Sequence, residues 1–160
     1  MRRLPIALLI ILTGISCTDQ LAYSEFRSTE NGEWDRDRPM EFTVTDPDTT
    51  RAHNLYLFVR NDNTFPYSNL FLIAEMTFPD GSTQRDTLEY EMANAAGQWL
   101  GEGLGSVREN KLGYKRDVVF PSSGVYTFTV SHAMRKNGNV DGVQSLPGIL
   151  DVGLQIESNE

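Results

Sequence analysis

GILDVGLQIE, residues 148–157, is the stretch that decides the fold class of this chain. Aliphatic side chains stand at every second position and point to one face of an extended backbone: Leu150, Val152, Leu154 and Ile156. Small, polar and acidic residues fill the positions between them. A period of two residues is typical of a β-strand that buries one face and exposes the other. The stretch therefore predicts a strand with one face in an apolar core.

Seven other stretches carry strand patterns rich in β-branched and aromatic residues, and turn residues separate them: 21–27, 40–46, 53–61, 69–78, 83–92, 116–120 and 125–134. Residues 69–78 are apolar on both faces, which predicts a central strand, and PDGS at 79–82 predicts the turn of a hairpin. No stretch shows a long 3.6-residue period. We therefore expect an all-β fold of about eight strands, a two-sheet antiparallel β-sandwich, with the jelly roll as one form of it.

The chain before these strands has the layout of a secretory signal. Arg2 and Arg3 form a basic start, residues 4–12 are almost wholly apolar, and small residues lead to Cys17, the single cysteine of the sequence. The apolar run is too short to cross a bilayer, which takes about 20 residues. One cysteine also allows no internal disulfide and no cysteine-based zinc site.

A small-residue site followed directly by cysteine resembles the lipobox of bacterial lipoproteins. Gly14 departs from the usual pattern, in which leucine is commonest at that position. We expect a signal peptide at 1–16 and lipidation of Cys17. The rest, 17–160, is expected to form a single lipid-anchored β-sandwich domain with a short N-terminal tether. The alternative is an ordinary secreted protein whose cysteine is free or buried.

The net charge of the chain limits the classes of partner that it can bind. Without Arg2 and Arg3, 12 basic residues stand against 22 acidic ones, a net charge of −10. Phosphate backbones repel such a domain, so we expect no nucleic-acid partner. Anionic lipid repels it as well, so attachment to a membrane must come from acyl chains.

No pattern of catalytic or metal-binding residues stands out. His53 and His132 show no metalloprotease motif and no i, i+4 pairing, and His132 is expected on the core face of its strand or at the end of that strand. NGNVDG at 137–142 has the first half of a calcium loop without the acidic twelfth position, so an inter-strand loop explains it better. We find no serine-nucleophile motif and no paired acid and base. The protein is therefore expected not to be an enzyme and to hold no cofactor. A hydrolase is the least favoured of the functions considered.

Aromatic and basic residues are the candidates for a binding surface. Trp34 and Trp99, together with Tyr67, could stack on a sugar ring, although Trp99 could equally plug the end of the sandwich. Arg135 and Lys136 are adjacent cations in an acidic chain. Either nearby carboxylates neutralise this pair, or Arg135 binds an acidic group of a partner through its planar fork.

Long stretches of the sequence resemble the GldH family of gliding-motility lipoproteins of Bacteroidetes. They are RNDNTFPYSNLFLIAEMTFPDG (60–81), DTLEYEMANAAGQWLGEGLGSVRENKLGYK (86–115), FPSSGVYTFTVSHAMRKN (120–137) and LPGILDVGLQIE (146–157). The resemblance implies a lipid-anchored envelope protein associated with the gliding machinery and the type IX secretion apparatus. It carries over one functional residue, the lipidated Cys17.

Two functions from different classes follow. The first is a non-catalytic interaction component that binds other gliding or secretion envelope proteins while its lipid anchor holds it to the membrane. We expect that anchor on the periplasmic face of the outer membrane, because Thr18 and Asp19 are not followed by a longer acidic run. The alternative is a glycan-binding jelly-roll module on the cell envelope. Open tryptophans on one concave face would favour the glycan-binding module, and buried ones the interaction component.

Overall fold

The computed structural model describes residues 20–159, which fold into ten β-strands. Their bounds are β1 Leu21–Ser28, β2 Glu33–Asp35, β3 Met40–Thr45, β4 His53–Asn61, β5 Asn69–Thr77, β6 Thr83–Glu91, β7 Arg108–Val118, β8 Val125–His132, β9 Ser145–Pro147 and β10 Ile149–Ser158. The all-β class is confirmed, but the count of about eight strands is wrong. The strands β2 and β9 have three residues each, too few for an alternating pattern to reveal them. Across residues 20–159 we find no helix that could cross a membrane.

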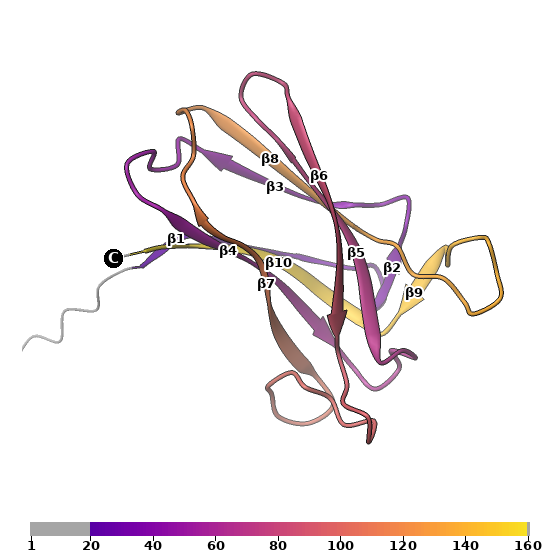
Figure 1. The fold of residues 1–160 in the computed structure, drawn as a ribbon. Helices are drawn as coiled ribbons and strands as arrows, with labels where there is room; N and C mark the ends of the chain where they lie inside the picture. Colours follow the sequence, from indigo (N-terminus) through magenta and orange to yellow (C-terminus); the bar gives the residue numbers. More distant parts are fainter. Residues whose placement is uncertain (1–19, 160) are drawn as a thin grey trace, which may run out of the picture.

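The strands form two four-stranded antiparallel sheets and one short ladder. One sheet has the order β1-β10-β4-β7, the other has the order β3-β8-β5-β6, and β2 pairs with β9. With β2 and β9 set aside, the remaining eight strands run 1-8-3-6 and 2-7-4-5, which is the strand order of a jelly roll. Figure 1 shows the two sheets and the short ladder beside them. The expected antiparallel sandwich is therefore confirmed.

Alternate residues of both sheets supply the core between them. The β4 pattern is confirmed, because Leu55, Leu57 and Val59 are fully buried. The pattern of β10 holds only from Val152 onward. The pairing of β10 with β4 shifts register between Ile149 and Asp151, so Ile149 enters the core and Leu150 does not. This bulge moves one side chain to the opposite face, which a strict period of two cannot show.

The strand β7 differs most from its predicted bounds. The pattern predicts a strand at 116–120, whereas β7 runs over Arg108–Val118. Asn110 and Leu112 are its two buried residues, and the others are half-buried or exposed. An edge strand with so few buried apolar positions shows almost no hydrophobic period. Its polar sequence therefore resembles that of a loop.

The loops gather at two opposite ends of the sandwich. The start of β1 and the end of β10 meet at the near end, where Leu21 pairs with Glu157. The same end holds the loops 46–52, 78–82 and 119–124, because the strands that they join end there. The far end holds the loops that follow β1, β4, β6 and β8, together with β2 and β9. In Figure 1 the C-terminus marks the near end, and the long loop before β9 extends from the far end.

Candidate functional site

A groove of about 1530 Å³ lies at the far end, against the outer face of β5. Phe71 and Ile73 line it because they alternate with the core residues of that strand and so point away from the core. Tyr67 lines it just before β5, and Met134 and Val143 line it from the segment between β8 and β9. The groove therefore has an apolar lining between a rigid strand and a loop.

The segment after β8 forms the second wall through backbone contacts. Ala133 N–H donates to the carbonyl oxygen of Phe71 at 2.8 Å, which continues the pairing along β5. Val143 N–H donates to the carbonyl oxygen of Met134 at 2.8 Å, and Arg135 forms a β-bridge with Gly142. These contacts make residues 134–143 a hairpin, called the far-end hairpin below.

Four cations line the groove and a smaller adjoining depression. Arg135 and Lys136 are exposed on the far-end hairpin and line the groove, whereas Arg36 and Arg85 line the depression of about 270 Å³ beside it. Among the described residues that line either hollow, Asp141 is the single carboxylate. The surface here is basic in a chain whose overall charge is strongly negative.

The ion pairs of these cations within residues 20–159 are weak or lacking. Arg36 Nε lies 3.9 Å from Asp37 Oδ1, and Arg85 Nη1 lies 3.9 Å from Glu75 Oε2, both at exposed positions. Arg135 and Lys136 form no ion pair with the part of the chain that the structure describes. Solvated pairs of this length contribute little, so the positive charges remain available to a ligand.

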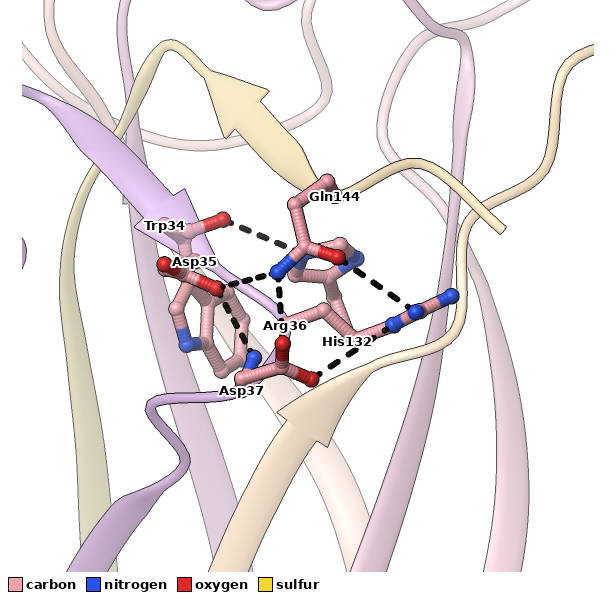
Figure 2. A network of polar contacts seen from close by, with 6 residues as sticks. All are labelled: Trp34, Asp35, Arg36, Asp37, His132 and Gln144. Atoms are coloured by element: carbon pink, nitrogen blue, oxygen red, sulfur yellow. Dashed lines mark hydrogen bonds and ion pairs between the residues drawn. The ribbon is translucent and has the colours of Figure 1, made fainter. Parts of the chain in front are cut away.

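A polar network fixes the segment that carries Arg36, as Figure 2 shows. Gln144 Nε2 donates to Asp35 Oδ1 and to Asp37 Oδ2, both at 2.8 Å, and Gln144 Oε1 accepts from Arg36 Nη2 at 3.4 Å. Asp37 N–H donates to Asp35 Oδ1 at 2.9 Å, and this bond lowers the pKa of Asp35 below its ordinary value. The two carboxylates beside Arg36 are thus held by Gln144.

Beneath this network, His132 and Trp34 pack together in the interior. His132 Nε2 lies 3.1 Å from the Trp34 carbonyl oxygen, which requires the proton on Nε2. Burial lowers the pKa of His132, because the imidazolium would lose its hydration there, and the nearby Arg36 lowers the pKa further. The expected place of His132 on the core face of β8 is confirmed, since 1% of its surface is exposed.

The structure corrects the expectation that Trp34 offers a binding platform. Its side chain is 1% exposed, its ring meets His132 edge-on with centroids 5.5 Å apart, and its indole N–H donates to the Arg38 carbonyl oxygen at 3.2 Å. Trp34 is the large buried residue of β2, where it closes the far end of the core. Its ring faces are therefore closed to a ligand.

The other candidate residues lie at the far end but do not form one site. Trp99 is half-buried against Phe65, its indole N–H donates to Asn63 Oδ1 at 3.0 Å, and it does not line the groove. Tyr67 does line the groove. Glycan binding would be favoured by two exposed tryptophans on one concave face. Residues 20–159 present no such pair, because Trp34 is buried and Trp99 is half-buried outside the groove. Cys17 lies outside the described residues.

The groove itself and the roles of Arg36, Arg85 and Gln144 are absent from the sequence-based predictions. The network joins residues 35–37 to Gln144, which lies more than 100 positions later in the chain. Within residues 20–159 we find no group of three histidine, cysteine or acidic residues that could hold a metal ion. The basic surface around the groove is therefore the arrangement best suited to bind a partner.

Solved structures resemble the chain only loosely. They include the VP2 subviral particle of infectious bursal disease virus, with 14% identity, a TM-score of 0.33, and coverage of 84% of this chain and 30% of that one. The T13 particle of the same virus gives 12% identity, a TM-score of 0.36, and coverage of 84% and 31%. The chain thus spans about a third of each of these capsid chains.

Sequence relatives are much closer and cover nearly the whole chain. A protein of Christiangramia forsetii named gliding motility lipoprotein GldH homolog is 46% identical over 91% of this chain and 88% of its own length. Gliding motility lipoprotein GldH of Flavobacterium johnsoniae is 38% identical over 97% of this chain and 96% of its own length. The family model for the GldH lipoprotein matches residues 21–156, from the first strand to the last. The chain therefore belongs to the GldH lipoprotein family.

Proposed function

We propose that the protein is a lipid-anchored component of the cell envelope that takes part in gliding motility and acts there by binding other proteins. The observation that carries this proposal is the similarity to gliding motility lipoproteins over the entire jelly roll. The partners would be envelope components of the gliding machinery and of the type IX secretion apparatus. The groove at the far end supports a binding role, because Arg135 and Lys136 line it without an ion pair to residues 20–159, and half-buried apolar side chains line it as well.

A non-catalytic role agrees with the residues in the groove. Its described lining includes one carboxylate, Asp141, and neither a histidine nor a cysteine. A hydrolase needs an acid and a base, or a nucleophile and a base, within reach of the same bond. The described lining offers Asp141 no second carboxylate and no histidine as its counterpart.

The attachment to the membrane rests on Cys17. Its thiol would carry the acyl chains, since the mature chain is acidic and cannot be held by anionic lipid. The periplasmic face of the outer membrane is the proposed location, because Thr18 and Asp19 lack the longer acidic run of surface-exported lipoproteins.

The proposal is tested in a strain that lacks the gene and receives it back as wild type or Cys17→Ser. We expect the deletion to stop gliding or type IX secretion, the wild type to restore it, and Cys17→Ser to fail while its protein leaves the membrane fraction. Cys17→Ser that stays in the membrane and restores function would contradict the anchor. A deletion without effect on motility and secretion would contradict the function.

A further inference from the structure

We propose that the far-end groove binds an acidic, extended segment of a partner protein, with Arg135 and Lys136 pairing with its carboxylates. This inference rests on the proposed function and names the chemistry of the partner. Three features of the site carry it: its lining, its charge and its position on the molecule.

The lining favours a polypeptide over a small anion. Half-buried Phe71 and Ile73 of β5 line one side of a groove of about 1530 Å³, and half-buried Val143 of the far-end hairpin lines the other, whereas Met134 beneath them is 2% exposed and belongs to the core. Apolar side chains on both walls can cover apolar side chains of a ligand, which a phosphate or a sulfate lacks. A volume of this size is also more than a small ion can fill. A peptide segment with both acidic and apolar residues uses the whole groove.

The charge favours an acidic ligand. Arg135, Lys136, Arg36 and Arg85 line the two adjoining hollows, and Asp141 is the one carboxylate in their described lining. Asp37 and Glu75 lie 3.9 Å from Arg36 and Arg85, whereas Arg135 and Lys136 form no ion pair within residues 20–159. Arg36 lies directly over the hairpin, because a Cβ atom on Gly142 would come within 2.5 Å of Arg36 Nη1. Glycine at 142 therefore lets a guanidinium group from the segment after β2 join those of the hairpin. Guanidinium groups bind carboxylates through two parallel hydrogen bonds.

The position of the groove disfavours the lipid surface as the source of the acidic groups. The described chain begins at Gln20 at the near end, just after Cys17, whereas the groove lies at the far end. When the near end is held at the membrane with the strands upright, the far end of strands nine residues long lies about 30 Å away. Nucleic acid is disfavoured because the remaining surface is acidic. A protein segment is left as the occupant.

The test places a benzophenone amino acid at Asn139, an exposed residue of the groove lining, in the full-length protein in living cells. The same probe at Ser123, exposed at the near end, is the matched control. After irradiation, the peptides bonded to each probe are sequenced by mass spectrometry. We expect the probe at 139 to bond to segments with more acidic than basic residues, and the probe at 123 not to do so.

Charge reversal then tests the role of the cations. We expect the double change Arg135→Glu with Lys136→Glu to reduce the yield at 139 by about tenfold or more, because like charges then oppose. The thermal melt should stay unchanged, since both side chains are exposed and lack ion pairs in the described chain. Arg116→Glu, an exposed arginine at the near end, is the control and should leave the yield unchanged.

Three outcomes would overturn the inference: bonding of the probe at 139 only to lipid or sugar, bonding only to neutral or basic segments, or an unaltered yield after charge reversal. If the control at 123 then bonds to gliding or secretion proteins, the proposed function stands and only the groove is wrong. If neither probe bonds to such proteins, the proposed function fails too.

Discussion

At the scale of single residues, Gly148 shows how tightly the far end is packed. Its φ is +80°, and a Cβ atom would lie 2.1 Å from the backbone nitrogen of Phe65. The Gly148 N–H donates to the Gly32 carbonyl oxygen, and its own carbonyl oxygen accepts from Asp62 N–H, both at 2.9 Å. Because the clash is with backbone, relief would require separating these loops.

We therefore expect Gly148→Ala to lower the free energy of unfolding by more than about 2 kcal/mol, through left-handed strain and the clash together. Gly113→Ala is the control, since nothing lies within 4 Å of its would-be Cβ and its φ is not left-handed. Denaturant melts of both variants give the comparison. A Gly148→Ala protein as stable as Gly113→Ala would show that these loops can move apart at little cost.

His132 provides a pH dependence that the structure explains. Its Nε2–H already bonds to the Trp34 carbonyl oxygen, and its Nδ1 has no hydrogen bond of ordinary geometry within the described chain. Its pKa in the folded protein is below the ordinary 6.5, so above that pH both the folded and the unfolded state hold a neutral ring. As the pH falls below about 6.5, the unfolded state takes up the proton first, and the stability contributed by the neutral ring is lost.

The expected result is a lower free energy of unfolding at pH 5.5 than at pH 7.5, and a smaller difference between the two pH values in His132→Gln. Asp35 and Glu25 also have lowered pKa values, but their ordinary values of 3.8 and 4.5 place their effect mainly below pH 5.5. Urea melts at the two pH values measure the difference. The same difference in wild type and His132→Gln would assign the pH dependence to other groups.

At the scale of elements, the register of β8 can be tested by adjacent positions. Phe128 is 2% exposed and stands opposite Phe42 of β3 and Met76 of β5, whereas Thr127 faces outward. We expect Phe128→Ala to cost about 3–5 kcal/mol of stability, because a large cavity is left between the sheets. Thr127→Ala should cost less than about 1 kcal/mol. Equal costs in denaturant melts would mean that the strand does not bury the face described here.

How well the sequence predicts an element depends on how much of it is buried. The strands β4 and β8 alternate because one whole face of each lies in the core, and the sequence places them within one or two residues. The edge strand β7 buries two side chains, and β2 buries Trp34 alone, so neither produces a period. The sequence therefore predicts Trp34 at the surface, because a lone tryptophan among charged neighbours gives no sign of the β9 strand that pairs with β2 and covers it.

At the scale of the whole molecule, the groove could not have been predicted from local pattern. It joins residues 66–73 to residues 133–147, and the adjoining depression adds Arg36 and Arg85 from distant parts of the chain. Arg135 and Lys136 were singled out because they are adjacent cations in an acidic sequence. Arg36 stands between two aspartates, and in the fold Gln144 binds both carboxylates while Arg36 lies 3.9 Å from Asp37. Long-range pairing therefore decides where each charged side chain lies relative to the groove.

The same architecture predicts how the protein stands on its membrane. From Cys17 to Leu21, the first residue of β1, the chain spans at most about 14 Å. A lipidated Cys17 must therefore hold the near end close to the bilayer, with the far-end groove about 30 Å further out. A fluorophore on Ser82→Cys, in the near-end turn 78–82, should transfer energy to labelled lipid headgroups more efficiently than one on Asn139→Cys.

The comparison uses the lipidated protein in vesicles, where acylation of Cys17 leaves the introduced cysteine as the thiol to label. Inserting 20 glycine and serine residues after Asp19 is the control, because a flexible chain of that length spans about 25 Å and lets the domain turn. The difference between the labels at 82 and 139 should then shrink. Equal transfer from the two labels in the wild-type protein would mean that the domain lies on its side, and greater transfer from the label at 139 would mean that the groove faces the bilayer. Either result would contradict the upright orientation.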